Sequence, residues 1–328
     1  MSDLHTGENL TSLLHLCTYC GKPPVSGEQL KRCSGCFAGP VYCGAPCQAA
    51  DWITHRTAYH GISRDSDFYK SVMEPSAQML GYESAYALSR GMSEYLEAHK
   101  WTLAALIKAY TLLHFGVWQF AASFPADKVL LLELVSLGPD RNPAEGFRLV
   151  SAHWRTVGEW LREADIPSDL HDPEVSKAFV RAKKATHSHF AARARYVGVL
   201  PVCFTIGGFP LVFWRMVPQY TPSNPMAPLT EIPWVKKTMN DMTVFCLWCI
   251  NHQVVLRPPR TVDATRPTPA VPGRLVRVRG SWRWRPFFTQ WTDLSEDPCP
   301  ELWEFLQGRM AAGDQPPTFY MNILDMFW

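Results

Sequence analysis

Eight cysteine and histidine side chains near the N-terminus have the spacing of metal ligands. Two cysteines separated by two residues can bind one tetrahedral zinc ion through sulfur atoms about 2.3 Å from the metal, and a second pair completes the site. Eight ligands therefore predict two zinc ions. The predicted ligands are Cys17, Cys20, Cys33, Cys36, Cys43, Cys47, His55 and His60.

Zinc explains these cysteines better than free thiols or disulfides do. The segment has few large apolar residues, so burial alone would not hold it folded. Structural zinc contributes about 10 to 16 kcal/mol per site in isolated fingers. Because the first residues lack a basic start followed by an apolar run, we expect no secretory signal and an intracellular protein, cytoplasmic or nuclear. Clustered cysteines in a reducing compartment are more often metal ligands than disulfides.

The segments CTYC, CSGC and VYCGAPCQAADWITHRTAYH resemble the MYND zinc finger, over residues 17–60. The rest of the chain is only loosely similar to MYND-domain proteins of mushroom-forming fungi. The resemblance implies that two zinc ions are held by interleaved ligand sets. One set is Cys17, Cys20, Cys43 and Cys47, and the other is Cys33, Cys36, His55 and His60.

The last ligand departs from the family pattern. The family usually ends with a cysteine four positions after its histidine, whereas here that position is Tyr59 and His60 follows it. On a regular helix His60 would lie about 140° around the axis from His55. Gly61 allows the helix end to loosen, which would let His60 reach the ion.

The resemblance also implies a partner, because MYND fingers bind short proline-containing peptides of the PxLxP kind. The family's peptide-contacting positions correspond here to Ser34, Gln48 and Trp52. An indole face suits an extended apolar peptide, while an amide and a hydroxyl can hydrogen-bond its backbone. The alternative is that Trp52 fills the finger's core and Gln48 is merely solvated.

The charge of the chain indicates neither nucleic acid nor a membrane as a general partner. The formal net charge is +2, and residues 1–61 contain four basic and four acidic side chains. Zinc-bound thiolates would make the finger more negative, which disfavours phosphate binding. Residues 196–214 approach the length of a membrane-spanning helix, but Gly207 and Gly208 between two apolar runs favour a buried β-hairpin.

We predict a small two-zinc MYND finger followed by an α+β domain. The expected divisions are a flexible N-terminus at 1–16, the finger at 17–60, a linker at 61–67 and the α+β domain at 68–328. Apolar periodicity predicts helices within 68–120, 173–192 and 302–310, and strands at 128–137, 147–154, 196–217 and 275–288. Residues 239–256 fit a helix or a strand, and the proline-rich segment 257–273 predicts a loop.

Four arginines alternate with apolar residues between Arg277 and Arg285. A regular strand would place the four arginines on one face, and a basic stripe beside tryptophans can bind single-stranded nucleic acid. This gives an alternative function, a nucleic-acid-associated regulator. We favour a solvated basic row opposite a core-facing apolar row. Its expected ion-pair partners are Asp293, Glu296, Asp297, Glu301 and Glu304.

The remaining motifs do not predict an enzyme. Cys246 and Cys249 have metal-like spacing, but they stand in the apolar run VFCLWCI and fit buried small hydrophobes. His187 and His189 fit surface positions. A SET-type lysine methyltransferase is the less favoured alternative, because the SET signature Asn-His-x-Cys-x-Pro-Asn is absent. We therefore expect no catalytic residues, and an adaptor or regulator that binds other proteins through the finger.

Overall fold

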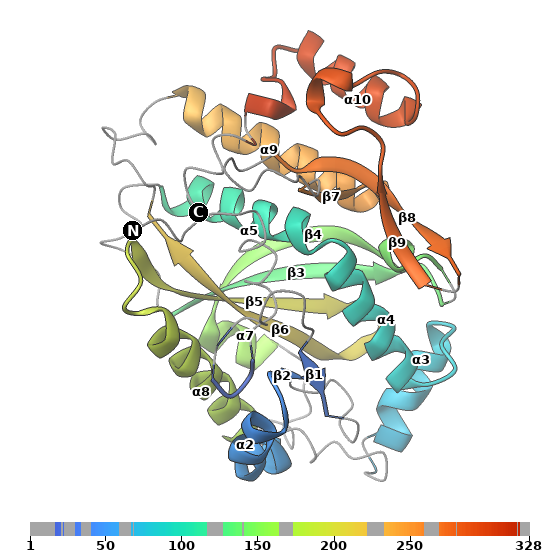
Figure 1. The fold of residues 1–328 in the computed structure, drawn as a ribbon. Helices are drawn as coiled ribbons and strands as arrows, with labels where there is room; N and C mark the ends of the chain where they lie inside the picture. Colours follow the sequence, from blue (N-terminus) through green and yellow to red (C-terminus); the bar gives the residue numbers. More distant parts are fainter. Residues whose placement is uncertain are drawn as a thin grey trace.

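The computed structural model describes residues 17–20, 22, 30–33, 41–58, 67, 69–116, 127–139, 141–163, 173–221, 233–258, 269–279, 281–319 and 321. Within these residues, an N-terminal finger lies beside a larger body of helices and sheets (Figure 1). The predicted flexible segment 1–16 and most of the predicted linker 61–67 lie outside the described residues.

The finger consists of a short hairpin and one helix. Strands β1 (Lys31–Arg32) and β2 (Val41–Tyr42) pair antiparallel. Helix α2 (Ala45–Ala58) begins three residues after β2. Pro46 in its first turn suits a helix start, because the N–H that proline lacks would have no partner there.

A four-stranded mixed sheet organises the body, with strand order β4-β3-β5-β6. The neighbouring pairs β3/β4 and β5/β6 are antiparallel, whereas β3 and β5 are parallel. The predictions of strands at 128–137 and 147–154 are confirmed. The strands are β3 (Lys128–Ser136), β4 (Phe147–Thr156), β5 (Tyr196–Ile206) and β6 (Phe209–Tyr220).

The predicted hairpin at 196–217 is confirmed. Strands β5 and β6 are connected at Gly207 and Gly208, and Gly208 has a φ of +78°, a value that glycine adopts without strain. The apolar residues 196–214 therefore form two paired strands of the central sheet and not one long helix. None of the described helices combines the length and apolar character that spanning a bilayer requires.

Helices cover both faces of the central sheet (Figure 1). Alternate residues of β3 point to opposite faces, so Leu130, Leu132 and Leu134 belong to one apolar cluster and Val129 to another. The first cluster lies under the long helices and the second, which includes Trp160 and Phe179, under the two helices that follow β4. The helices are α4 (Ala85–Ala98), α5 (Lys100–Phe115) and α9 (Pro233–Asn251) on the first face and α7 (Val157–Glu163) and α8 (Pro173–Phe190) on the second.

The remaining elements extend the body at two ends. A π-helical turn (Tyr69–Met73) and α3 (Glu74–Met79) precede α4, and 3-10 turns occur at Pro143–Glu145 and Trp291–Asp293. A second, antiparallel sheet has the order β7-β8-β9, and α10 confirms the predicted helix at 302–310. These last elements are β7 (Val255–Arg257), β8 (Val271–Val278), β9 (Ser281–Pro286) and α10 (Pro300–Ala311).

Two sequence-based predictions are wrong around this second sheet. The predicted loop 257–273 begins and ends in strands, because Arg257 belongs to β7 and residues 271–273 belong to β8. The segment 275–288 is a hairpin, not one strand, because Val278 pairs with Ser281 across two intervening residues. With this turn, each odd-numbered residue of β8 pairs with an even-numbered residue of β9, and paired residues lie on the same face of the hairpin. Arg277 therefore lies opposite Trp282. The arginines therefore do not share one face.

Candidate metal centre

The turn that contains Cys17 and Cys20 is attached to strand β2. The Thr18 N–H donates to the Val41 carbonyl at 2.8 Å, and the Val41 N–H donates to Thr18 Oγ1 at 3.0 Å. The Cys17 N–H closes the turn by donating to the Lys22 carbonyl at 2.8 Å. Because Cys43 directly follows β2, this attachment brings cysteines from distant parts of the sequence together.

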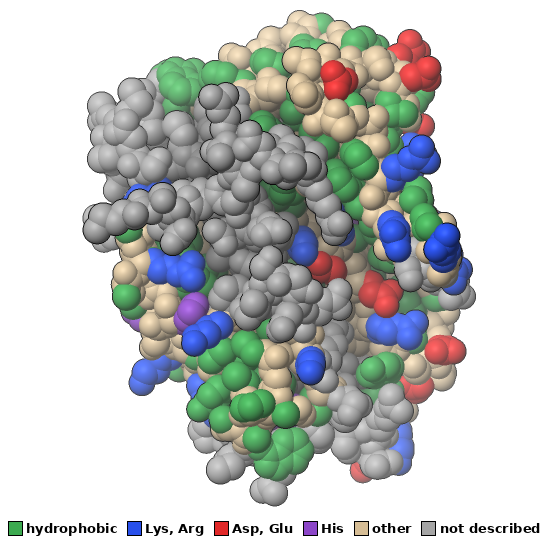
Figure 2. All heavy atoms as spheres, viewed as in Figure 1, with side chains coloured by type: hydrophobic (Ala, Val, Ile, Leu, Met, Phe, Trp, Pro, Cys, Tyr) green, Lys and Arg blue, Asp and Glu red, His purple; other side chains and the backbone are tan. Residues whose placement is uncertain are grey.

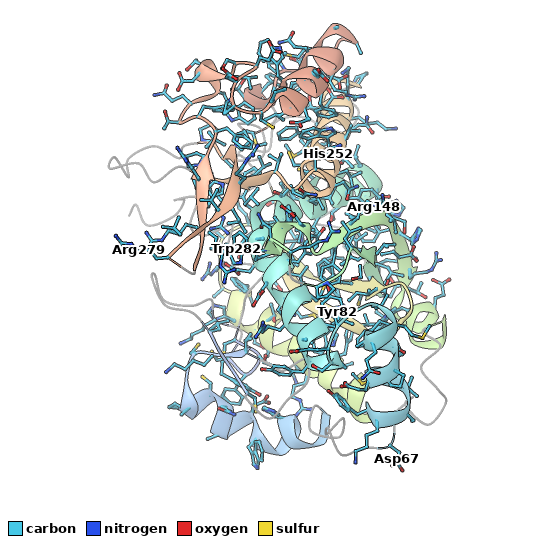
Figure 3. The ribbon with its side chains drawn as sticks, turned by 90° about the vertical axis from the view of Figure 1, so that its right-hand side faces the viewer. Asp67, Tyr82, Arg148, His252, Arg279 and Trp282 are labelled. Atoms are coloured by element: carbon cyan, nitrogen blue, oxygen red, sulfur yellow. The ribbon has the colours of Figure 1, made fainter. Side chains whose placement is uncertain are left out.

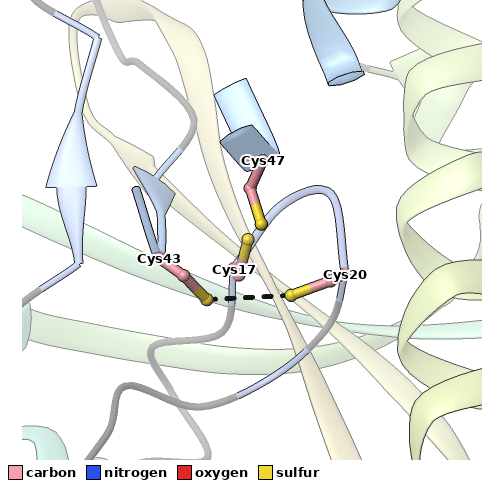
Figure 4. A group of neighbouring side chains, drawn as sticks. All are labelled: Cys17, Cys20, Cys43 and Cys47. Carbon is pink, nitrogen blue, oxygen red and sulfur yellow. Dashed lines mark hydrogen bonds between the residues drawn. The ribbon is translucent and has the colours of Figure 1, made fainter. Parts of the chain in front are cut away.

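Four cysteines converge on one point. The sulfur atoms of Cys17, Cys20, Cys43 and Cys47 all lie within 4.8 Å of one another (Figure 4). Cys20 Sγ and Cys43 Sγ are 3.7 Å apart. A tetrahedral zinc ion with bonds of about 2.3 Å requires neighbouring sulfurs to be about 3.8 Å apart. This cluster fits a zinc site, and its members are the four residues that the resemblance assigns to one ion.

The electrostatics of the cluster favour a bound cation. Burial raises the pKa of Cys43, and burial together with the neighbouring thiols raises that of Cys47 to about 11. Burial alone would also raise the pKa of Cys17, but backbone N–H groups of Cys20 and Cys43 hold it below its usual value. Four adjacent sulfurs thus repel one another when ionised, and a divalent ion would offset that repulsion.

The second predicted ligand set is only partly within the described residues. Cys33 follows β1 and is buried, and His55 is fully buried on α2. Cys36 and His60 lie outside the described residues. The second zinc site therefore stays a prediction.

Tyr42 and Asp51 support His55, a role that the sequence analysis missed. The Tyr42 hydroxyl donates to Asp51 Oδ2 at 2.8 Å and lies 2.6 Å from His55 Nδ1. Burial raises the pKa of Asp51, and the Tyr42 hydroxyl partly offsets that rise. Asp51 precedes His55 by four residues, which places both on one side of α2. That spacing is the sequence signal that could have suggested a supporting carboxylate.

Two of the three predicted peptide-contacting residues lie on α2. Gln48 and Trp52 are four residues apart and share one side of the helix. The Trp52 side chain is 41% exposed, so it does not fill a closed core, and its ring lies 5.4 Å from that of His55. Ser34 lies outside the described residues.

Strands β3 and β4 bring a serine, a histidine and a carboxylate together, which the sequence did not suggest. Ser151 Oγ lies 3.0 Å from His153 Nε2 and donates to Glu133 Oε2, and that carboxylate oxygen lies 3.3 Å from the same His153 nitrogen. In a catalytic triad the acid instead binds the other imidazole nitrogen and orients the ring. The arrangement is thus a cross-strand polar network, and the serine hydroxyl lowers the pKa of Glu133.

The other cysteine and histidine predictions can also be placed. Cys246 and Cys249 are buried on α9 in the main apolar cluster, which confirms their assignment as small hydrophobes. His187 is exposed as predicted, and its Nδ1 lies 2.9 Å from the Tyr196 hydroxyl. His189 is half-buried, so its prediction as a surface residue is only partly met.

Comparison with known proteins supports the same assignment. The family model described as MYND finger matches residues 17–58, a range that contains all four clustered cysteines. No curated protein and no solved structure matches the chain. Residues 17–58 of this chain are therefore a MYND-type zinc finger.

Proposed function

We propose that this chain is a non-catalytic intracellular adaptor or regulator, cytoplasmic or nuclear, whose finger binds proline-containing peptides of the PxLxP kind. MYND fingers generally mediate protein–protein interactions. The observation that carries the proposal is the exposed indole of Trp52 beside Gln48 on α2. The same helix carries the clustered Cys47, so the metal site would fix the orientation of this surface.

The chemistry of this surface suits an extended apolar peptide. An indole offers a wide apolar face against which proline rings can pack at little entropic cost. The Gln48 amide can both donate to and accept from a peptide backbone. A proline-rich peptide is already extended before it binds, which reduces the ordering cost of association.

We further propose that a second zinc ion is bound by Cys33, Cys36, His55 and His60. The burial of Cys33 and His55 supports this set, because such residues in a small unit are typical of structural metal sites. With Nδ1 facing the Tyr42 hydroxyl, His55 would bind zinc through Nε2. A hydrogen bond to the other ring nitrogen commonly orients a zinc-binding histidine.

Metal analysis of the reduced full chain tests the two-zinc proposal. We expect two zinc ions per chain, with Cys17→Ser weakening one site and Cys33→Ser the other. His60→Ala should weaken zinc retention far more than Tyr59→Phe. A stoichiometry of one, or equal effects of the last two changes, would contradict the proposed ligand set.

Calorimetric titration of the full chain with a PxLxP peptide tests the proposed partner. Trp52→Ala should remove a platform worth about 2 kcal/mol and lower the affinity at least tenfold. Gln48→Ala should cost about 1 kcal/mol. Trp234→Ala is the matched control, because Trp234 is 46% exposed on α9. If wild-type protein with full zinc occupancy binds no peptide at millimolar concentration, the finger does not read such peptides.

A further inference from the structure

The β8–β9 hairpin concentrates positive charge that the rest of the chain lacks. Residues 271–286 contain five arginines and no aspartate or glutamate, although the formal net charge of the whole protein is only +2. Figure 2 shows basic side chains at the right-hand edge of the molecule, where this hairpin lies in Figure 1. The arginines are Arg274, Arg277, Arg279, Arg283 and Arg285.

The base of this hairpin is anchored to the body. The Trp284 indole N–H donates to the Val255 carbonyl at 3.0 Å, and the Asn142 amide donates to the Leu275 carbonyl at 2.9 Å. A Cβ atom on Gly273 would lie 2.4 Å from the Arg285 carbonyl oxygen, so only glycine allows the two strands this approach. The base therefore holds the tip in a defined position.

The tip, in contrast, is exposed on both faces. Val278 is 39% and Trp282 41% exposed, and Arg279 points away from the body at the end of the hairpin (Figure 3). Because Arg277 pairs with Trp282 across the strands, a guanidinium and an exposed indole occupy the same face. A cation and an aromatic platform thus stand side by side.

The charge of the tip is not neutralised within the described protein. From the sequence, we expected the basic row to pair with acidic residues between Asp293 and Glu304. No described carboxylate lies within 4.0 Å of the guanidinium groups of Arg277, Arg279 or Arg283. Asp293, for example, instead accepts hydrogen bonds from Thr289 and Thr292.

We propose that the tip of the β8–β9 hairpin binds single-stranded nucleic acid. Guanidinium groups bind phosphates through paired hydrogen bonds, and an exposed indole can stack on a base whatever its identity. A duplex or an acidic peptide would use the arginines but not the indole face, which is why a single strand fits best. This site is separate from the finger and does not depend on the proposed peptide binding.

Fluorescence polarisation with the full chain and a fluorescein-labelled 12-nucleotide oligo(dT) or oligo(U) tests this inference. Sequence-independent binding typically has a dissociation constant between about 1 and 100 µM. The double change Arg277→Gln and Arg279→Gln should weaken binding at least tenfold, whereas Arg283, which pairs with Val276 on the opposite face, should matter less. The double change should also lower the slope of log K against log salt by about 1.4, since single strands contribute about 0.7 per phosphate contact. Trp282→Ala should weaken binding about tenfold.

Matched variants distinguish binding at the hairpin tip from binding that depends only on the overall positive charge of the protein. Replacing Arg277 and Arg279 by lysine should preserve the salt slope, because the charge remains. Glutamine at Arg90 and Arg148, which are exposed arginines on other elements, should leave binding within about twofold of wild type. Trp234→Ala controls for loss of an exposed indole elsewhere.

Three outcomes would overturn the proposal. The first is absence of binding at 100 µM protein in low salt, and the second is an equal loss in the distributed arginine control. The third is a competitor result: a 12-residue poly-glutamate peptide, a mixed-sequence duplex or phosphatidylserine vesicles binding more tightly than the oligonucleotides. Tighter duplex binding that is insensitive to Trp282→Ala would assign the arginines to duplex phosphates instead.

Discussion

The strands of the finger are two residues long, whereas those of the central sheet reach twelve residues in β6. The body buries a continuous apolar cluster that includes Phe204, Leu106 and Met242, each at most 1% exposed. In the described part of the finger, the buried side chains are mainly cysteines and the polar Tyr42, Asp51 and His55 network. A small unit has too little volume for an apolar core of its own. The body is therefore held together by apolar burial, whereas the finger has a four-cysteine cluster that fits a zinc ion, and metal binding would supply the stability that burial does not.

Zinc removal should produce the largest difference in stability between the finger and the body. Chelation withdraws about 10 to 16 kcal/mol per site from the finger, so its amide protons should lose their protection from exchange. The body has no predicted zinc ligand and should keep its protection. Hydrogen exchange followed by mass spectrometry, with and without chelator, measures both regions at once. Equal deprotection of β5 and α2 would show that the two regions do not have separate sources of stability.

A core substitution should have the reverse effect. Phe204→Ala removes a ring that is 1% exposed and should lower the free energy of unfolding of the body by about 3 to 5 kcal/mol. Zinc content should not change. Thermal unfolding together with metal analysis checks both outcomes. Val150→Ala is the control, because Val150 is 50% exposed and its loss should cost less than about 0.5 kcal/mol.

The two regions should also respond to opposite ends of the pH range. Burial, with a further contribution from Arg195, lowers the pKa of Lys108 to about 7 from its usual 10.5. Between those values the unfolded chain binds a proton that the folded body does not, so stability should rise with pH by at most about 1.4 kcal/mol per unit. The finger should instead lose zinc in acid, because protons compete for its thiolates.

Replacing Lys108 by methionine tests the predicted rise in the stability of the body above pH 7. The wild-type body should gain stability relative to Lys108→Met between pH 7 and 10, as measured by urea unfolding at several pH values. Lys108 Nζ donates to the Tyr220 carbonyl at 2.7 Å, and both the ammonium and the neutral amine can do so, so the substitution also removes that bond at every pH. A difference between the two proteins that is independent of pH would show that Lys108 stays protonated in the fold.

Removal of the Tyr42 hydroxyl should have a smaller effect, confined to the finger. Tyr42→Phe keeps the ring but removes the hydroxyl that contacts Asp51 and His55, which should cost about 1 kcal/mol. Zinc should then be released at a chelator concentration about fivefold lower, because about 1.4 kcal/mol corresponds to a factor of ten. Tyr19→Phe is the control, since Tyr19 is 46% exposed. If both variants release zinc alike, the Tyr42 hydroxyl does not support the metal site.

Local patterns predicted much of this molecule. Gly207 and Gly208 between apolar runs predicted a hairpin because turn residues act over a few positions. The cysteine spacing predicted metal ligands, whereas the grouping of Cys17, Cys20, Cys43 and Cys47 around one ion was implied by the resemblance to the MYND finger. Residues 239–256 remained ambiguous, and the structure divides them between α9 and β7.

Features that depend on pairing between strands could not be predicted in this way. The network of Glu133, Ser151 and His153 exists because β3 and β4 pair Glu133 with Ser151. The prediction that the arginines share one face was wrong because the chain turns back between Val278 and Ser281. Odd-numbered residues of β8 therefore share a face with even-numbered residues of β9. The register of a strand pair depends on both strands, so the spacing of residues within one segment predicts neither the β3/β4 pairing nor the β8/β9 pairing.

The contact between α2 and α8 has a thermodynamic consequence for the finger. Burial raises the pKa of Asp51 on α2, and the positive charge of Arg181 on α8 acts in the opposite direction, so a residue of the body influences a residue of the finger. If this contact stabilises the folded finger, it also increases the affinity of the finger for zinc by the corresponding factor. The reason is that folding and metal binding are linked equilibria, and their coupling is reciprocal. A ligand that separated α2 from α8 would therefore loosen the zinc, and loss of zinc would in turn release the surface of α8.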